Sequence, residues 1–314
     1  MKILREFKRN SVVLCLSVLL VFAVLPDVYA QGKGRSDPIE LTFAALPQEI
    51  SAMSAELYLP LMKYMAKKTG KKVAFYMTTS YAAEMEAMVG GFVDVARLGP
   101  APYVIGRDRD RSIEVFAVQT TAPGITQRGG AGYYGCLITK KGSGLTTIPQ
   151  LRGKTLGLTD PGSTSGYLLP KVTFPDEKLG GEPLEKYFGK IVWTGRHDAA
   201  MLAVKEGRVD AAFTNGANME RAIGAGLVAK EDFNFLWWSH VVPRDPWVYR
   251  VNLKPELKAK IREAFFTFKS GEVEGADRFW KGTKAVEFIA ATDSMYDVTR
   301  KLVKAKKELK KKKK

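Results

Sequence analysis

The sequence has few of the residues that form covalent cross-links or metal sites. Its 314 residues include only two cysteines and two histidines. Cys15 lies in an N-terminal apolar run, and Cys136 lies in the run Cys136-Leu137-Ile138. If the N-terminal run is removed, one cysteine remains, which cannot form an internal disulfide and is expected to be a buried, inert thiol. Two histidines are too few for a His-rich metal site, so we expect no metal and no cofactor.

Long apolar segments are absent after the N-terminus. No segment beyond residue 30 reaches the roughly 18 apolar residues that a transmembrane helix needs. At the N-terminus, four basic residues precede an apolar run over residues 12–25, and small side chains at residues 28–30 fit a cleavage site. This layout predicts a signal peptide over residues 1–30, cleaved after Ala30, and a periplasmic protein. A retained membrane anchor is the alternative.

The positive charge of the chain is concentrated at its end. The formal net charge is +16, of which residues 301–314 supply +8 through nine lysines and one glutamate. Residues 1–30 supply +2, so only +6 is spread over residues 31–300. This distribution does not indicate a nucleic-acid-binding protein, and none is expected as a partner. We interpret residues 303–314 as a solvated basic tail, with contact to anionic lipid headgroups as the alternative.

Nucleotide-binding and hydrolase motifs fail in their context. Residues 130–135 match G-x-G-x-x-G, but a predicted strand follows where a helix is required. Residues 153–155 resemble the end of a P-loop, without its first glycine or its helix. Residues 162–166 are similar to a nucleophile elbow, but Thr164 stands where the serine must be. The sequence therefore indicates no enzyme.

Short β-rich runs alternate with helical patterns from Leu41 onward, which indicates α/β architecture. Strands are expected at 41–46, 72–78, 93–98, 113–119, 133–140, 154–159, 190–194, 209–214, 233–238 and 247–251. Helices are expected near 53–69, 81–90, 101–107, 182–188, 197–207, 217–225, 254–268 and 293–309. A helix–Gly–strand unit at 82–96 recurs at 199–212, which favours two similar lobes with the site in a cleft between them.

Three helix starts carry polar side chains suited to an anion. Ser163-Thr164-Ser165 is bounded by Gly162 and Gly166 and follows a predicted strand, so hydroxyls and unpaired backbone N–H groups meet there. Simple N-capping is the alternative. His197 begins a second helix and Tyr81 a third, where a structural histidine and rim packing of the tyrosine are the respective alternatives.

These stretches resemble a known family. Residues 160–167, 195–200 and 243–246 are similar, in the same order, to the phosphate/phosphite/phosphonate-binding subunits of ABC transporters, and the resemblance covers residues 41–302. It implies a type II-like periplasmic-binding-protein fold, with two parallel-sheet lobes joined by two crossing segments near 133–140 and 239–248. The expected divisions are lobe 1 over 38–135 and 245–302, and lobe 2 over 140–237.

The resemblance also implies a ligand site. The implied ligand-binding residues are Tyr81, Tyr133, Tyr134, Ser163, Thr164, Ser165, His197 and Asp245, with Asp198 and Asn215 as further candidates. For Asp245, capping of a turn between its two prolines is the alternative. Family members that bind aminoalkylphosphonates carry a glutamate where this chain has Ala217, so we expect a smaller or uncharged substituent.

The leading hypothesis is a monomeric binding protein that delivers a small phosphorus oxyanion to the permease of an ABC importer. A sensory protein of the same fold, which presents its closed lobes to a receptor, is the alternative.

Overall fold

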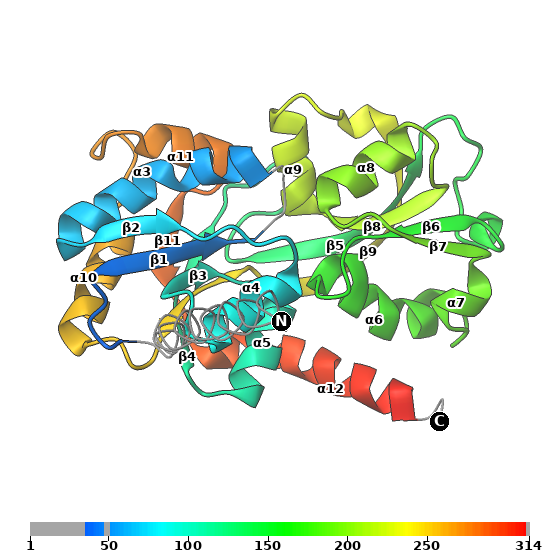
Figure 1. Ribbon diagram of the computed structural model, residues 1–314. Coiled ribbons are helices and arrows are strands. Elements are labelled where there is room, and N and C mark those ends of the chain that lie inside the picture. The colour runs from blue at the N-terminus through cyan, green and yellow to red at the C-terminus, as the bar shows by residue number, and fades with distance from the viewer. Residues whose placement is uncertain (1–34, 47–50, 312–314) are drawn as a thin grey trace, which may run out of the picture.

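The computed structural model describes residues 35–46 and 51–311, which form two α/β lobes side by side (Figure 1). Lobe 1 is built on a six-stranded sheet and lobe 2 on a five-stranded sheet. The expected two-lobed α/β class is confirmed. The expected signal peptide lies outside the described residues. Within the described ranges, every helix is too short or too polar to cross a membrane.

The sheet of lobe 1 has the strand order β11-β4-β10-β3-β1-β2. Its strands are β1 (Glu40–Ala45), β2 (Lys72–Phe75), β3 (Val95–Arg97), β4 (Ile113–Thr120), β10 (Pro246–Arg250) and β11 (Glu287–Ala290). Side chains alternate between its faces, so Leu41 and Phe43 pack in one core cluster while Ala44 packs in another. Both faces of this sheet are therefore covered.

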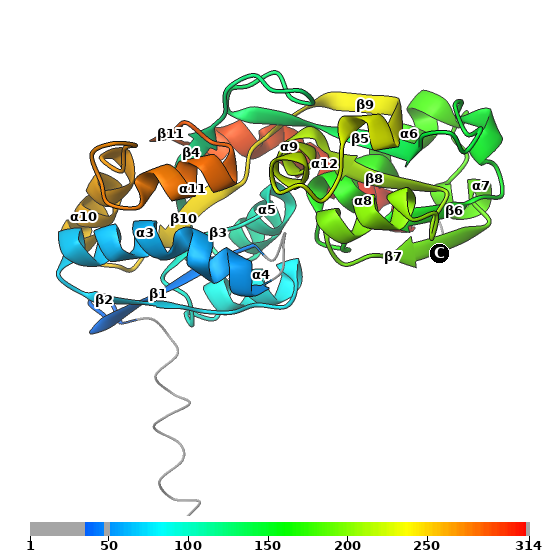
Figure 2. The ribbon, with the colours of Figure 1, turned by 90° about the horizontal axis from the view of Figure 1, so that it is seen from above.

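Helices cover the two faces of lobe 1 in separate groups (Figure 2). One face carries α3 (Ser51–Thr69), α10 (Pro255–Phe266) and α11 (Ala276–Thr283), which bury aromatic residues such as Phe265 and Phe279 against Trp247 of the sheet. The other carries α4 (Tyr81–Val89) and α5 (Pro100–Arg109). Pro100 suits the first turn of α5, where its missing N–H has no helical partner.

Lobe 2 repeats this layering around the strand order β7-β6-β8-β5-β9. Its strands are β5 (Gly132–Lys140), β6 (Thr155–Leu158), β7 (Lys190–Trp193), β8 (Ala211–Asn215) and β9 (Phe233–Pro243). One face carries a π-helical turn (Thr164–Leu168), α6 (Leu169–Lys178) and α7 (Leu184–Tyr187); the other carries α8 (His197–Lys205) and α9 (Gly216–Gly224). Short 3₁₀ turns lie at Pro149–Leu151, Lys230–Asp232 and Asp293–Tyr296.

The sheets are mixed, which corrects the expectation of parallel sheets. In lobe 1, β10 and β11 run antiparallel to their neighbours; in lobe 2, β5 does. Two of these strands, β5 and β10, come directly after the chain has crossed between lobes. β5 is the first strand of lobe 2, and β10 is inserted between β3 and β4 of lobe 1. Sequence analysis also missed α11 and β11, and it predicted only a short helix from Ser163 where the π-helical turn continues into α6. The recurring helix–Gly–strand units correspond to α4–β3 and α8–β8. The strand of each unit is parallel to a neighbour: β3 to β1 in lobe 1, and β8 to β6 in lobe 2.

The lobes are joined by two neighbouring crossings. The first comprises residues 121–131 and precedes β5, earlier in the chain than the expected 133–140. The second consists of Arg244 and Asp245 alone, between β9 and β10. The Arg244 N–H donates to Ala131 O at 2.9 Å, which ties the two crossings together. The hinge is therefore short and braced.

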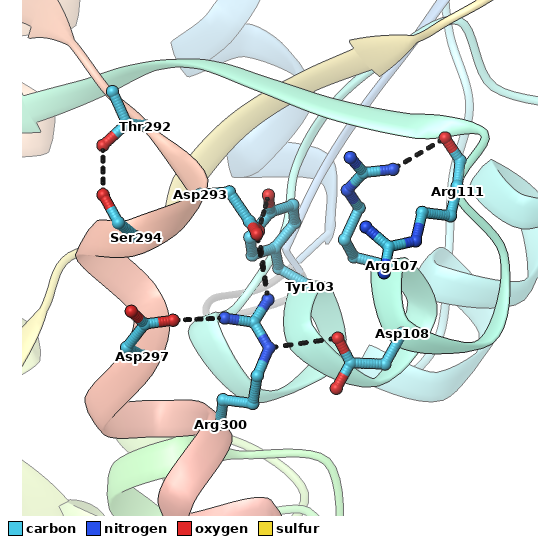
Figure 3. A network of polar contacts seen from close by, with 9 residues as sticks. All are labelled: Tyr103, Arg107, Asp108, Arg111, Thr292, Asp293, Ser294, Asp297 and Arg300. Atoms are coloured by element: carbon cyan, nitrogen blue, oxygen red, sulfur yellow. Dashed lines mark hydrogen bonds and ion pairs between the residues drawn. The ribbon is translucent and has the colours of Figure 1, made fainter.

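A third link is the C-terminal helix α12 (Asp297–Lys311), which overlaps the helix expected at 293–309 and buries Val303, while most of residues 304–311 are exposed. Figure 3 shows Arg300 donating to three carboxylates, those of Asp108, Asp293 and Asp297, at 3.1, 3.1 and 2.6 Å. The bond to Asp108 of α5 holds α12 on lobe 1, whereas Asp297 belongs to α12 itself. Farther along, α12 contacts α6 of lobe 2.

Candidate functional site

A small cavity lies between the lobes, and we call it the head-group cavity. It has room of about 20 Å³ for the centres of water-sized spheres. Eight of the ten candidate site residues line it: Tyr81, Tyr133, Ser163, Thr164, Ser165, His197, Asn215 and Asp245. Thr164 Oγ1 accepts from the Ala101 N–H of lobe 1 at 2.9 Å, so the lobes meet at the cavity wall. The structure is thus a closed form.

Five helix starts converge on this cavity. Tyr81 and His197 are the first residues of α4 and α8, and Pro100 begins α5. Thr164 begins the π-helical turn, and Asn215 caps α9. The carboxyl ends of the preceding strands place these starts at one edge of each sheet. Helix N-termini present unpaired N–H groups and positive dipole ends, so their convergence favours an anion.

The hydroxyl residues at 163–165 combine capping with ligand geometry. Ser163 Oγ accepts from the Gly166 N–H at 3.1 Å, which is the capping role considered above. Gly166 is required here, because a Cβ at that position would lie 1.8 Å from Thr159 Oγ1. Asn215 Nδ2 donates to Ser165 Oγ at 2.9 Å, and Asn215 Oδ1 accepts from the Asn218 N–H at 2.8 Å. The hydroxyls are therefore fixed by backbone and side chain before any ligand arrives.

His197 is a neutral, buried imidazole. Burial first, and the nearby Arg221 second, lower its pKa to about 3. Its Nδ1 lies 3.1 Å from Thr214 Oγ1, and its Nε2 lies 3.4 Å from Ser163 Oγ. When the Thr214 hydroxyl donates to Nδ1, the single ring proton lies on Nε2, which faces the cavity. The histidine can thus donate to an anion without carrying charge.

Two tyrosines add neutral donors. Tyr81 and Tyr133 are buried, and burial, with Asp245 as the next contribution, raises the pKa of each phenol above its ordinary value. Both therefore stay protonated at neutral pH and can donate a hydrogen bond. They approach the cavity from opposite lobes.

The cavity is also lined by three arginines that the sequence analysis did not assign to the site: Arg97, Arg221 and Arg244. Together with the single carboxylate of Asp245 they leave an excess of two positive charges. One signal was available for Arg97, which interrupts an apolar strand although arginine is rarely buried without a partner. Arg221 lies one helical turn after Ala217, so both reach the same side of α9.

Arg244 is the least satisfied of these cations. Its side chain is buried, and its Nε and Nη1 atoms have no hydrogen-bond partner within the described residues. Burial, followed by repulsion from Arg97, lowers the pKa of its guanidinium to about 10. It therefore remains charged at neutral pH, with donors directed into a desolvated space. Such a group requires an anionic partner.

Asp245 supplies the acceptor in the cavity. Its Oδ2 accepts from Arg97 Nη2 at 2.9 Å, and Arg97 Nη1 donates to Tyr58 Oη at 2.8 Å. A ligand oxygen beside this carboxylate must carry a proton to avoid repulsion between two acceptors.

Tyr134 and Asp198 lie outside the cavity. Tyr134 follows Tyr133 in a strand, so its ring points to the other face, where the Arg128 guanidinium lies 5.5 Å from the ring centre. Asp198 follows His197 in α8 and accepts from Arg196 Nε at 3.0 Å, at a different surface. The described residues contain no cluster of three or more His, Cys, Asp or Glu side chains that could hold a metal.

Comparison with known proteins identifies the family. The family of periplasmic substrate-binding proteins of phosphonate ABC transporters matches residues 43–296. The chain belongs to this family. The phosphate-import protein PhnD of Mycolicibacterium smegmatis is 30% identical over 96% of both chains. The phosphonates-binding periplasmic protein of Escherichia coli is 30% identical over 80% of this chain and 72% of its own.

A solved structure supports the membership in this phosphonate-transporter family. The binding-protein component of a Pseudomonas aeruginosa ABC phosphonate transporter has a TM-score of 0.74 and 27% identity, covering 85% of this chain and 86% of its own. The family consists of substrate-binding transport proteins of the periplasm, and the resemblance seen in the sequence is confirmed.

Proposed function

We propose that this protein captures a singly protonated phosphorus oxyanion, such as phosphite, phosphate or a phosphonate head group, and presents it to the permease of an ABC importer. The two curated relatives are a phosphate-import protein and a phosphonate-binding protein, which supports a ligand of this class. The same relatives favour import over the sensory alternative. We further propose that the protein acts without catalysis and as a monomer.

The observation that carries the proposal is the buried guanidinium of Arg244. It lies at the hinge, and two of its nitrogens lack a partner within the described part of the chain. An oxyanion between the lobes supplies acceptors for it, for the five helix starts and for the hydroxyls of Ser163 and Ser165. One ligand thus satisfies donors from both lobes, which couples binding to closure.

Asp245 sets the protonation state of the preferred ligand. Phosphite, phosphate and phosphonate anions carry a proton near neutral pH, and sulfate does not. The proton can be donated to the carboxylate, whereas sulfate would place a second acceptor there. We therefore propose discrimination against sulfate as part of the function.

Binding calorimetry tests the proposal directly. Wild-type protein is titrated with phosphite, phosphate, methylphosphonate and sulfate, and Ser143→Ala serves as a control because Ser143 lies on an exposed turn. We expect at least one phosphorus anion to bind to both proteins much more tightly than sulfate. Equal affinity for sulfate, or no binding of any phosphorus anion, contradicts the proposal.

The periplasmic location of the family supports export of this chain, and cleavage after Ala30 remains a prediction. Mass spectrometry of the protein recovered from the cell envelope is expected to find Gln31 as the first residue. Retention of Met1 contradicts it.

A further inference from the structure

A second, larger space opens beside the head-group cavity. The volume open to the centre of a water molecule is about 630 Å³ here, compared with about 20 Å³ in the cavity. We call it the interlobe groove. The cavity accommodates a tetrahedral head group and little more, whereas the groove has the size of ordinary small-molecule sites. A ligand with a longer substituent therefore has space only in the groove.

The groove adjoins the cavity across a shared wall. Asn218 and Arg221 line both spaces, and Arg221 Nη2 donates to Asn218 Oδ1. This pair forms the shared wall, and both side chains lie on α9, one turn apart. A substituent that reaches past this pair would lie in the groove. Figure 2 shows α9 of lobe 2 beside α11 of lobe 1, the two helices that bound it.

The floor of the groove is apolar and its side along α9 is narrow. Leu57, Met201 and Ala222 contribute apolar surface, and Leu227 is 42% exposed beside them. The side along α9 is narrow because the end of the Lys284 side chain lies close to Gly224, 2.7 Å from where a Cβ would be. An alkyl chain laid on this floor would be removed from water.

The rim carries positive charge that the groove does not neutralise. The two carboxylates that line the groove already form ion pairs: Glu56 with Arg278 at 2.8 Å, and Asp198 with Arg196 at 3.0 Å. Lys281 and Lys284 also line the groove and form no ion pair with the described residues. The far end of the groove therefore complements an anionic group.

We propose that the interlobe groove binds the organic substituent of the ligand, and that the protein takes phosphonates or phosphate monoesters whose alkyl chain ends in an anionic group. This inference rests on the proposed function. Ala217, in the cavity wall, supplies no carboxylate for an amine, which agrees with the expected lack of an aminoalkyl group. The expected limit to a small substituent applies only to the cavity, and the groove removes it.

Calorimetry with a ligand series tests the groove. The ligands are methylphosphonate, butylphosphonate and 4-phosphonobutanoate, and the proteins are wild type, Ala225→Trp and the control Ala259→Trp. Ala225 is exposed and lines the groove, whereas Ala259 is exposed on α10. We expect wild type to bind the butyl compounds more tightly than methylphosphonate, by about fourfold for each CH₂ that becomes fully buried.

The indole of Ala225→Trp should fill the groove. We expect it to weaken 4-phosphonobutanoate binding at least tenfold and to change methylphosphonate binding less than twofold, with the control like wild type. Retained methylphosphonate affinity shows that the variant folds. If the butyl compounds do not bind to a protein that binds methylphosphonate, or if the tryptophan affects all ligands equally, the groove is not a substituent site.

The charged end group is tested separately. Lys281→Gln should weaken 4-phosphonobutanoate binding by about two- to fivefold, the range of an exposed ion pair, and leave butylphosphonate unchanged. Lys260→Gln on α10 is the matched control. Equal effects on both butyl ligands contradict the anionic end group. If neither phosphite, phosphate nor any phosphonate binds to wild type, the proposed function fails and the groove inference fails with it.

Discussion

Replacing Arg244 with methionine should close the empty protein and abolish its response to ligand. In the closed form the pKa of this guanidinium falls well below its ordinary value, to about 10, chiefly because of burial. One pKa unit corresponds to about 1.4 kcal/mol, so the charged side chain destabilises the closed, empty form by roughly 3 kcal/mol. For a base with a lowered pKa this cost is fully present at every pH below about 10 and declines gradually as the pH rises from there toward the ordinary pKa of arginine.

Opening of the lobes would admit water to Arg244 and remove that cost. Arg221 approaches from lobe 2, and its repulsion also contributes to the lowered pKa of Arg244. Without ligand, both effects favour the open form; with an anion in the cavity, the charge becomes an attraction. Methionine has similar reach and no charge, so Arg244→Met should shift the equilibrium toward closure by on the order of 100-fold.

Small-angle scattering measures this shift. Empty Arg244→Met should have the smaller radius of gyration of ligand-saturated wild type, and added ligand should not change it. Its affinity should fall at least 100-fold, because two charge-assisted hydrogen bonds of about 1.5–3 kcal/mol each are lost. Arg208→Met, at an exposed position, is the control. An empty variant as open as wild type, or one with wild-type affinity, refutes the reasoning.

Three further predictions concern the cavity. Ser163→Ala and Ser165→Ala should each weaken phosphite binding roughly tenfold in calorimetry. Ser163→Ala should also lower the free energy of unfolding by about 1 kcal/mol, because a helix cap is lost. Wild-type affinity in both variants contradicts this prediction. Asp245→Asn should narrow the affinity gap between phosphite and sulfate, because the amide donates where the carboxylate only accepts; an unchanged gap contradicts this role. His197 has a lowered pKa, so the free energy of unfolding should fall as pH drops below 6.5, where only the unfolded chain protonates; the loss should reach roughly 3 kcal/mol at pH 4.5. In thermal unfolding, His197→Gln should lack this part of the pH dependence. Identical pH profiles of variant and wild type argue against this role.

The sequence predicted the helix starts of the site better than its charges. A strand followed by hydroxyls and glycine, as at 160–166, is a local signal, and the structure places Ser163, Thr164 and Ser165 in the cavity. The cations Arg97, Arg221 and Arg244 come from three distant stretches. Their meeting depends on how the lobes close, and no local pattern encodes that.

Other differences also have physical reasons. Tyr133 and Tyr134 could not be told apart because the pleat assigns them to opposite faces, and only strand pairing decides which face meets the cavity. The antiparallel placement of β5 and β10 follows from the crossings between lobes, which are not local either. The helix α11 is short and follows a glycine-containing turn, so its periodicity was too brief to predict.

The C-terminal helix has a mechanical consequence. Arg300 fixes α12 to lobe 1, while Lys306 lies 4.3 Å from the ring centre of Tyr167 on lobe 2. Any rotation of the lobes must therefore slide or bend this helix as well as turn the two crossings. A load applied to α12, as in immobilisation on a surface through this helix, is transmitted to both lobes at once and resists their separation. Holding the protein through α12 should therefore restrain the rotation of the lobes, whereas holding it elsewhere on one lobe should not.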